Sequence, residues 1–262
     1  MKIDFHTHGK LTKKIPFSSQ YTDWLFEEAT KSGLDAICLT EHFNTCGFAE
    51  IYEYIRQVYE KDGDYFIAPT GLHIFPGAEV DIAEGGHTLV IGDIDTILEI
   101  NQRLEPYKEK GLYLSFEMWA RMVKEYSVLF GGAHPFREGG HIPELLQEQQ
   151  EAFDFLDLNG KDMAQGAEKN RAMIDELSKK IQRPIVAGSD THQSFQYGCI
   201  YNDFQNNCST IGELRREMDA GCYEIAMSDY LSFQVRAAGC MKRSLKTIYA
   251  MGGDYVSIML DE

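Results

Sequence analysis

The sequence predicts an α/β protein in which a mostly parallel sheet closes into a barrel. Short apolar runs alternate with segments of helical spacing, which is typical of successive strand–helix units. There are about seven such units, and this number favours a closed barrel over an open sheet. Polar residues follow many of the apolar runs, and the carboxyl ends of strands form the rim where barrel enzymes place their active sites. The chain length fits one such domain, predicted over residues 1–262.

The first half of the chain begins with an apolar strand pattern and continues into an amphipathic segment. Tyr21–Ser32 is expected to be a helix, because Trp24, Leu25 and Ala29 mark one apolar side and Gly33 follows as a stop signal. The expected strands cover residues 2–6, 34–40, 72–80 and 87–92, and a second helix is expected over 49–59, followed by helical patterns through about residue 126.

The second half continues the alternation. Residues 193–208 are rich in Asn, Gln and aromatic side chains and are expected to form a loop that either walls a pocket or packs on the surface. The expected strands cover residues 128–133, 153–159 and 184–188, with a short apolar run near 222–233, and the expected helices cover 162–180, 210–220 and 235–251.

The formal net charge of −16 and the pI of about 4.9 describe an acidic protein. Tight, non-specific binding to duplex nucleic acid depends on Lys and Arg, so stable nucleic-acid binding is not expected. A small phosphorylated ligand is compatible with this charge, because bound metal ions reverse the local field.

The sequence shows no secretory signal and no membrane span, since it opens with a strand pattern and no stretch approaches about 18 apolar residues. None of the six cysteines forms a pair with the CxxC spacing of a zinc ribbon. We therefore expect a cytoplasmic protein with free thiols and no membrane partner. The sequence leaves the oligomeric state open.

A His-x-His pair ends the first expected strand, in the stretch Asp4–His8. Side chains alternate between the two faces of a strand, so His6 and His8 are expected on one face, with Asp4 one step behind. Two imidazoles in this arrangement are able to bind one metal ion. Asp4 is expected to orient a histidine ligand rather than to bind the ion itself.

Further histidines and carboxylates recur at the ends of later strands. They are His42, Glu79, His134, Asp190 and His192, with His87 at the start of the strand that follows Glu79. Imidazole and carboxylate without thiolate suit Zn²⁺, Mn²⁺ or Fe. Because these residues exceed the needs of one ion, two or three clustered divalent ions are predicted.

Seven short motifs carry these residues, in a fixed order along nearly the whole chain. They are Asp4–His8, Leu39–His42, Gly77–Glu79, His87–Leu89, Ala133–Arg137, Asp157–Gly160 and Gly188–His192. Single motifs of this kind are common, but the ordered set is specific. In this set the sequence resembles the polymerase and histidinol phosphatase (PHP) family of metal-dependent phosphoesterases.

The resemblance implies a distorted (β/α)₇ TIM-like barrel, the PHP fold, with a metal cluster at its rim. The implied ligands are His6, His8, Glu79 and Asp190 for the first ion, Glu79, His87 and His134 for the second, and His42 and His192 for the third. The family usually supplies a further His or Asp to the third ion shortly after the His-x-His pair. Residues 9–16 contain no His, Asp or Glu, which leaves the occupancy of the third site open.

Five residues outside the ligand set are candidates for substrate contacts. Arg137 would either clamp a phosphate through its planar guanidinium or form an ordinary salt bridge. Asn159 would either contact substrate or form a turn. Lys13 and Lys14 would either meet a phosphate or remain solvated, and His141 would contact substrate, transfer a proton or lie in a mobile loop.

The predicted reaction is hydrolysis of a small phosphate monoester, histidinol-phosphate-like or nucleotide-like, by a hydroxide held between metal ions. Glu79, His134 and Asp190 would form the catalytic centre, and Arg137 would neutralise charge on the phosphoryl oxygens. Two alternatives stay open. One is an amidohydrolase-like metallohydrolase, which also opens with His-x-His, and the other is a non-catalytic metal-binding accessory or sensor domain.

Overall fold

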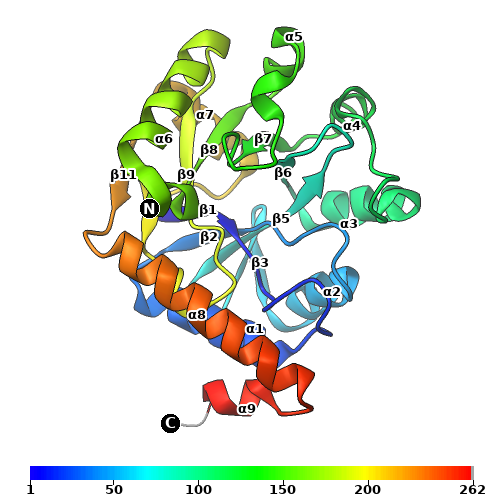
Figure 1. Ribbon diagram of the computed structural model, residues 1–262, viewed down its shortest axis with the longest axis vertical. Helices are drawn as coiled ribbons and strands as arrows, with labels where there is room; N and C mark the ends of the chain where they lie inside the picture. Colours follow the sequence, from blue (N-terminus) through cyan, green and yellow to red (C-terminus); the bar gives the residue numbers. More distant parts are fainter. Residues whose placement is uncertain (261–262) are drawn as a thin grey trace.

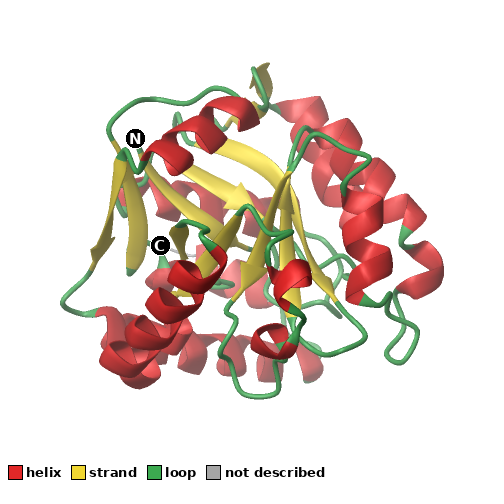
Figure 2. Cartoon of the chain, turned by 90° about the horizontal axis from the view of Figure 1, so that it is seen from above, coloured by secondary structure: helices red, strands yellow, loops and turns green. Residues whose placement is uncertain are grey.

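Seven strands form a barrel at the centre of the computed structural model, which describes residues 1–260 (Figure 1 and Figure 2). They are β1 (Lys2–Thr7), β2 (Ala36–Leu39), β5 (His73–Asp81), β6 (His87–Ile91), β7 (Leu129–Ala133), β8 (Phe155–Asn159) and β9 (Ile185–Gly188). Hydrogen-bonded neighbours follow this order from β1 to β9. The predicted barrel class is therefore confirmed.

The barrel closes where the end of β9 meets the end of β1. The backbone N–H of Asp190 donates to the carbonyl of His6 at 2.7 Å, and that of His8 donates to the carbonyl of Thr191 at 3.0 Å. Thr7 and Thr191 form an isolated parallel bridge. Closure thus occurs at the carboxyl ends of both strands and brings the segment after β9 against the histidine pair of β1.

One strand of the barrel runs against the others. β6 pairs antiparallel with both β5 and β7, whereas the remaining neighbours from β1 to β9 are parallel. A tight connection therefore replaces a helix between β5 and β6, and it sets His87 opposite Asp81. Because β6 is reversed, its first residue lies at the same rim as the last residues of the parallel strands. This explains how a histidine at a strand start joins the others.

Helices cover the outside of the barrel. They are α1 (Ser19–Lys31), α2 (Phe48–Val58), α3 (Ile94–Arg103), α4 (Phe116–Val123), α5 (Gln147–Gln150), α6 (Gly160–Ile181), α7 (Ile211–Ala220), α8 (Leu231–Ala250) and α9 (Tyr255–Leu260), with 3₁₀ turns at Glu105–Tyr107, Ile142–Glu144 and Ser194–Gln196. The long helix α8 crosses the face seen in Figure 1. Among the helices of residues 1–260, none combines the length and apolar character that crossing a bilayer requires.

Two short additions extend the sheet at its edges. β3 (Glu60–Asp62) and β4 (Tyr65–Ile67) form a hairpin on β5, while β10 (Ile200–Phe204) pairs antiparallel with β1 and β11 (Tyr223–Met227) pairs with β10. The prediction that residues 193–208 are a loop is therefore wrong for Ile200–Phe204. Tyr197 and Phe204 are buried, so they pack in the core and do not wall a pocket.

Side-chain alternation separates a filled barrel interior from the layer that faces the helices. Phe5, Phe75 and Phe155 belong to the interior cluster, and the rings of Phe5 and Phe155 meet edge to face with centroids 5.7 Å apart. A Cβ on Gly131 would come within 2.2 Å of the Phe155 ring, so close packing admits only glycine there. Since aromatic rings fill the interior, the ligand site is restricted to the rim.

A register shift in β1 redirects the histidine motif. Asp4 pairs with Ile37 and Thr7 pairs with Leu39, so β1 has one more residue than β2 between the two pairs. An extra residue of this kind is a β-bulge, which interrupts the strict alternation of faces.

The bulge lets two consecutive side chains face the barrel axis. Phe5 packs on Phe155, and His6 hydrogen-bonds to Asp157, which shares a face of β8 with Phe155. Asp4 makes no hydrogen bond to the His6 ring. Its Oδ1 accepts instead from the backbone N–H groups of His6 and Ser189, at 3.0 and 2.9 Å.

Candidate metal centre

Glu79, near the end of β5, lies in the middle of a group of histidines. Its Oε2 is 2.6 Å from Nδ1 of His42. Its Oε1 is 2.5 Å from Nδ1 of His87 and 3.1 Å from Nε2 of His134. The Nε2 atoms of His6 and His8 each lie 3.6 Å from a Glu79 oxygen. One buried carboxylate thus occupies the position that a ligand shared between two ions would need.

Four groups of three residues have ligand atoms within 4.8 Å of one another. They are His6, His8 and Glu79; Glu79, His87 and His134; His6, His134 and Asp190; and His8, His42 and His192. Several of these atoms are buried without a hydrogen-bond partner, including Nε2 of His6 and both ring nitrogens of His8. Unpaired buried polar atoms are costly, so this donor set fits divalent ions that would accept the lone pairs.

The group of His8, His42 and His192, which corresponds to the third predicted ion, contains three imidazoles where two were predicted. The ring of His8 stacks on those of His192 and His42, with centroids 4.0 and 4.4 Å apart. His192 donates from Nδ1 to the carbonyl of Lys10 at 2.9 Å, which leaves its Nε2 free. Residues 9–16 supply no further ligand atom, but His8 reaches this group as well as the first one.

Asp190, just after β9, is held by two cations. Its Oδ1 lies 2.8 Å from Nζ of Lys161, and its Oδ2 accepts from an Nη of Arg137 at 2.7 Å. Nε2 of His8 lies 3.3 Å from Oδ1. Burial raises the pKa of Asp190, but Lys161 and Arg137 outweigh it and hold that pKa well below its usual value. The carboxylate is therefore anionic and oriented toward the histidines.

Asp157, in the middle of β8, orients the first histidine. His6 donates from Nδ1 to Oδ2 of Asp157 at 2.9 Å, so the opposite nitrogen of the neutral ring carries the lone pair. The same oxygen accepts from the backbone N–H of His134 at 3.3 Å and from the side-chain amide of Asn159 at 3.0 Å. A carboxylate in this position fixes the ring and makes a histidine a better metal ligand.

Backbone strain and close packing also concentrate here. His134 has φ of 31° and Asp190 has φ of 56°, in the left-handed region that side chains other than glycine rarely adopt. A Cβ on Gly188 would lie 2.3 Å from Cβ of His6 and 2.7 Å from Oδ1 of Asp157. Such strained and crowded positions are typical of functional sites.

The charged groups divide the histidines by protonation state. Burial lowers the pKa values of His42 and His134 to about 4, so both are neutral. Burial also acts on His6 and His87, but nearby carboxylates, Glu79 foremost, outweigh it and raise their pKa values, that of His87 to about 10. The pKa of Glu79 is well below its usual value despite burial, because the surrounding histidines favour the anion.

Comparison with known families agrees with this geometry. The family model of the PHP domain matches residues 4–183. This chain belongs to the PHP domain family. The matched region ends before β9, so Asp190, His192 and the whole of α8 lie beyond it. No curated protein sequence matches the chain.

Solved structures with the same fold share little sequence with this PHP domain. PsfC from Pseudomonas syringae PB-5123 is 19% identical with a TM-score of 0.74, covering 93% of this chain and 98% of its own. The lesion-specific endonuclease EndoQ from Pyrococcus furiosus is 21% identical with a TM-score of 0.63, covering 86% of this chain, which spans only 57% of that protein. An amidohydrolase from Chromobacterium violaceum is 14% identical with a TM-score of 0.50, covering 87% and 99%. These likenesses show the fold alone.

The predicted substrate-contact residues of this PHP domain differ in their surroundings. Arg137 directs its fork at protein acceptors, with Nε on Asp162 at 2.9 Å and its two Nη atoms on Asp190 and Asn159, each at 2.7 Å. Asn159 also caps α6 through the N–H of Lys161. Neither side chain is free to bind a phosphate without breaking these contacts, so both fit a positioning role.

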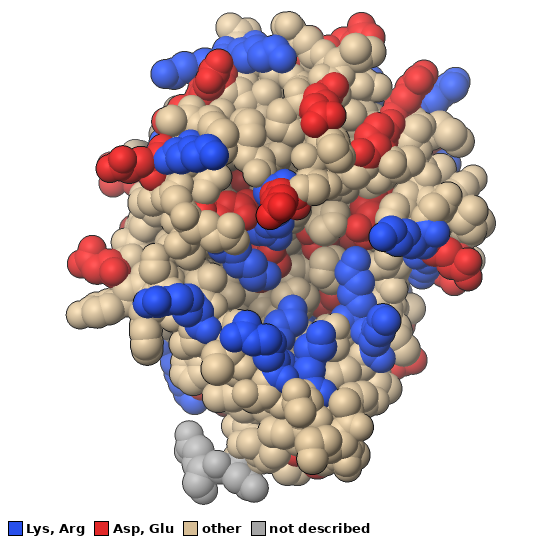
Figure 3. All heavy atoms as spheres, viewed as in Figure 1, with Lys and Arg blue, Asp and Glu red and all other residues tan. Residues whose placement is uncertain are grey.

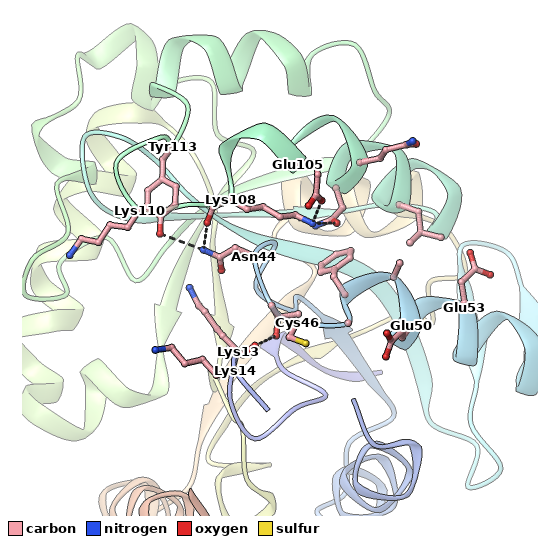
Figure 4. A pocket seen from close by; sticks show the side chains of 17 residues that line it. Lys13, Lys14, Asn44, Cys46, Glu50, Glu53, Glu105, Lys108, Lys110 and Tyr113 are labelled. Atoms are coloured by element: carbon pink, nitrogen blue, oxygen red, sulfur yellow. Dashed lines mark hydrogen bonds and ion pairs between the residues drawn. The ribbon is translucent and has the colours of Figure 1, made fainter. Parts of the chain in front are cut away.

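The other three predicted contacts lie in two different places. Lys13 and Lys14 line a groove of about 1060 Å³ (Figure 4) and also a smaller hollow that reaches His42 and His192. His141 is 44% exposed and pairs with Glu144 at 2.9 Å. The two lysines thus border the metal centre, whereas His141 has a local partner on the surface.

Three further residues of the centre were not predicted. They are Asp157, which holds His6, Lys161, which contacts Asp190, and Asp81, whose Oδ1 lies 3.0 Å from Nε2 of His87. The motif Asp157–Gly160 contains the first of them, and a carboxylate inside an otherwise apolar strand was the available signal. Lys161 follows that motif directly.

Proposed function

We propose that this PHP domain, over residues 1–262, is a hydrolase that cleaves small phosphate monoesters with two or three divalent ions, Zn²⁺, Mn²⁺ or Fe²⁺. The observation that supports the proposal is the convergence of Glu79, Asp190 and six histidines at one rim, with ligand atoms left unpaired in the protein. Such a dense set of imidazole and carboxylate groups is costly to bury without ions.

The ions would be held by the four groups of three ligand residues described above, two of which share Glu79. Divalent ions bound there would acidify water and offset negative charge on phosphoryl oxygens. The protein keeps Glu79 and Asp190 anionic, and it keeps His42 and His134 neutral, which are the protonation states that metal ligation requires.

Lys161 is the cation best placed to contact the phosphoryl group. Its Nζ touches Asp190, its side chain is 29% exposed, and it lines a hollow that contains His192. Arg137, in contrast, has three protein partners. We therefore assign phosphate contact to Lys161 and assign the orientation of Asp190 to Arg137.

The charge of the chain favours a small ester over nucleic acid. EndoQ shares this fold and is an endonuclease, but it is 21% identical to this chain. A net charge of −16 would repel a long polyanion over most of the surface.

The test is phosphate release by metal-stripped protein that has been reloaded with Mn²⁺, Zn²⁺ or Fe²⁺. p-Nitrophenyl phosphate is the first substrate, and bound metal is counted by elemental analysis. We expect two or three ions per chain and activity that chelation removes. Metal uptake with no hydrolysis of any phosphate ester would favour a binding domain, and hydrolysis of cyclic amides alone would favour an amidohydrolase.

A further inference from the structure

A row of cations lies on α8, outside the part of the chain that the family model matches. It consists of Arg236, Lys242, Arg243 and Lys246, and we call it the α8 cation row. Arg243 follows Arg236 by seven residues, and Lys246 follows Lys242 by four and Arg243 by three, so these side chains lie on one side of the helix. In Figure 3, Lys and Arg side chains gather on this face of the molecule and border a hollow in which acidic side chains are visible.

The α8 cation row borders two hollows that reach the metal centre. Arg236, Lys242 and Arg243 line one of about 570 Å³, together with Lys161 and His192. Lys242 and Lys246 line the other, of about 520 Å³, whose further lining residues include Lys14, His42 and His192. A ligand in either hollow would lie against the ligand histidines and the row at the same time.

The cations of the row have no carboxylate partner. Among residues 1–260, no Asp or Glu oxygen lies within 4.0 Å of a charged nitrogen of Arg236, Lys242, Arg243 or Lys246. Arg103, Arg171 and Arg215, elsewhere on the surface, each pair with an acid. The grouping of four such cations on one helix, beside the ligand histidines, suits an anionic ligand.

We propose that the α8 cation row binds a second phosphate group of the substrate, so that the substrate is a small bisphosphate. This inference rests on the proposed function, which places the scissile phosphate at the metal centre. A phosphate dianion offers three acceptor oxygens and suits several Lys and Arg donors at once. The hollows hold a small molecule, and the acidic surface beyond them disfavours a long polyanion.

The first test measures binding to the metal-free protein by calorimetry. The ligands are two matched pairs, fructose 6-phosphate with fructose 1,6-bisphosphate and adenosine 5′-monophosphate with adenosine 3′,5′-bisphosphate. In the double variant Lys242→Gln/Lys246→Gln, we expect affinity for a bisphosphate to fall by about 10-fold or more and that for its monophosphate by less than about 3-fold. Lys246→Gln alone, at an exposed position, guards against misfolding. Lys169→Gln on the exposed side of α6 removes the same charge and should change neither affinity.

The second test compares hydrolysis of the same pairs by the metal-loaded protein. We expect kcat/KM to favour the bisphosphate in the unmodified protein and to lose that preference in the double variant. The inference would be overturned if the double variant lost kcat/KM equally for both members of each pair. It would also be overturned if only hydrolysis of a phosphorylated oligonucleotide depended on the row. Absence of hydrolysis with every metal and ester would contradict the proposed function, whereas the calorimetry still decides the role of the row.

Discussion

The carboxylate of Asp157 accepts a hydrogen bond from Nδ1 of His6 at 2.9 Å, across 151 residues of sequence. Both side chains are fully buried. The bond fixes the tautomer of the neutral His6 ring, so that Nε2 faces Glu79 with its lone pair available once the ring has lost its second proton. Asp157 would therefore determine how well the first histidine binds metal, without being a ligand itself.

Replacement of Asp157 by Asn is the first prediction. The amide retains the size of the side chain but loses the charge that favours the correct ring orientation. Substitution of a residue that holds a metal ligand in place typically lowers metal affinity by about 10- to 100-fold, and we expect a loss in that range. Competition with a chromophoric chelator measures it. Asp219→Asn, on the exposed side of α7, is the control, and equal affinities in the two variants would contradict the role of Asp157.

Glu79→Gln is the second prediction. Glutamine has no charged carboxylate that two ions could share. The substitution also removes the anion around which the histidines gather. We expect phosphatase activity to fall by more than about 100-fold, which is the upper end of the effect of replacing a residue that only positions a metal ligand. Metal content should also fall, and circular dichroism should be unchanged. Glu148→Gln on the surface is the matched control, and full activity in Glu79→Gln would rule out the bridging position.

The location of the site at the rim was predictable because the ends of the strands can be recognised from the sequence. Apolar runs that stop at His42, Glu79, His134 and Asp190 place those residues at one edge of any parallel barrel. The structure brings them together through neighbouring strands. The local sequence pattern was sufficient to predict this location, because these residues all lie at the same end of the barrel.

Other features depend on pairing between distant segments, which local pattern does not contain. The reversal of β6 follows from a tight connection, and the bulge in β1 follows from its pairing with β2. The contact of Asp157 with His6 joins segments that meet only after the barrel closes, and the contact of Lys161 with Asp190 depends on the pairing of β8 with β9. The strand at Ile200–Phe204 was missed because its polar residues resemble a loop until β1 supplies a partner.

Gly188→Ala is the third prediction. The new Cβ would meet Cβ of His6 at 2.3 Å and Oδ1 of Asp157 at 2.7 Å, and both of these neighbours are fully buried. Overpacking of this kind costs about 1–3 kcal/mol of the free energy of unfolding, measured by chemical denaturation. Because His6 must shift, metal affinity should fall as well. Gly212→Ala on α7, where the new Cβ meets nothing closer than 3.8 Å, should leave metal affinity unchanged.

Arg137→Lys is the fourth prediction, and it separates positioning from phosphate binding. Lysine retains the charge but cannot reach Asp162, Asp190 and Asn159 with one planar fork. If Arg137 orients Asp190, affinity for metal should fall in the absence of any substrate. A phosphate clamp would instead raise KM and leave metal affinity unchanged. Arg171→Lys, at an exposed ion pair with Asp175, is the control for the substitution itself.

The fifth prediction concerns pH. His6 and His87 have raised pKa values in the metal-free protein, so both carry a proton at neutral pH, held by Glu79, Asp157 and Asp81. A protonated imidazole cannot bind metal, so ions must displace these protons, and metal affinity should rise as pH increases from 6 toward the pKa of His87 of about 10. Calorimetry in buffers with different ionisation enthalpies should report release of about two protons per chain at pH 7, one from each histidine.

In His87→Asn, proton release should fall by about one and the pH dependence of the remaining metal binding should become shallower. Metal binding with no proton release and no pH dependence would mean that neither histidine is a ligand.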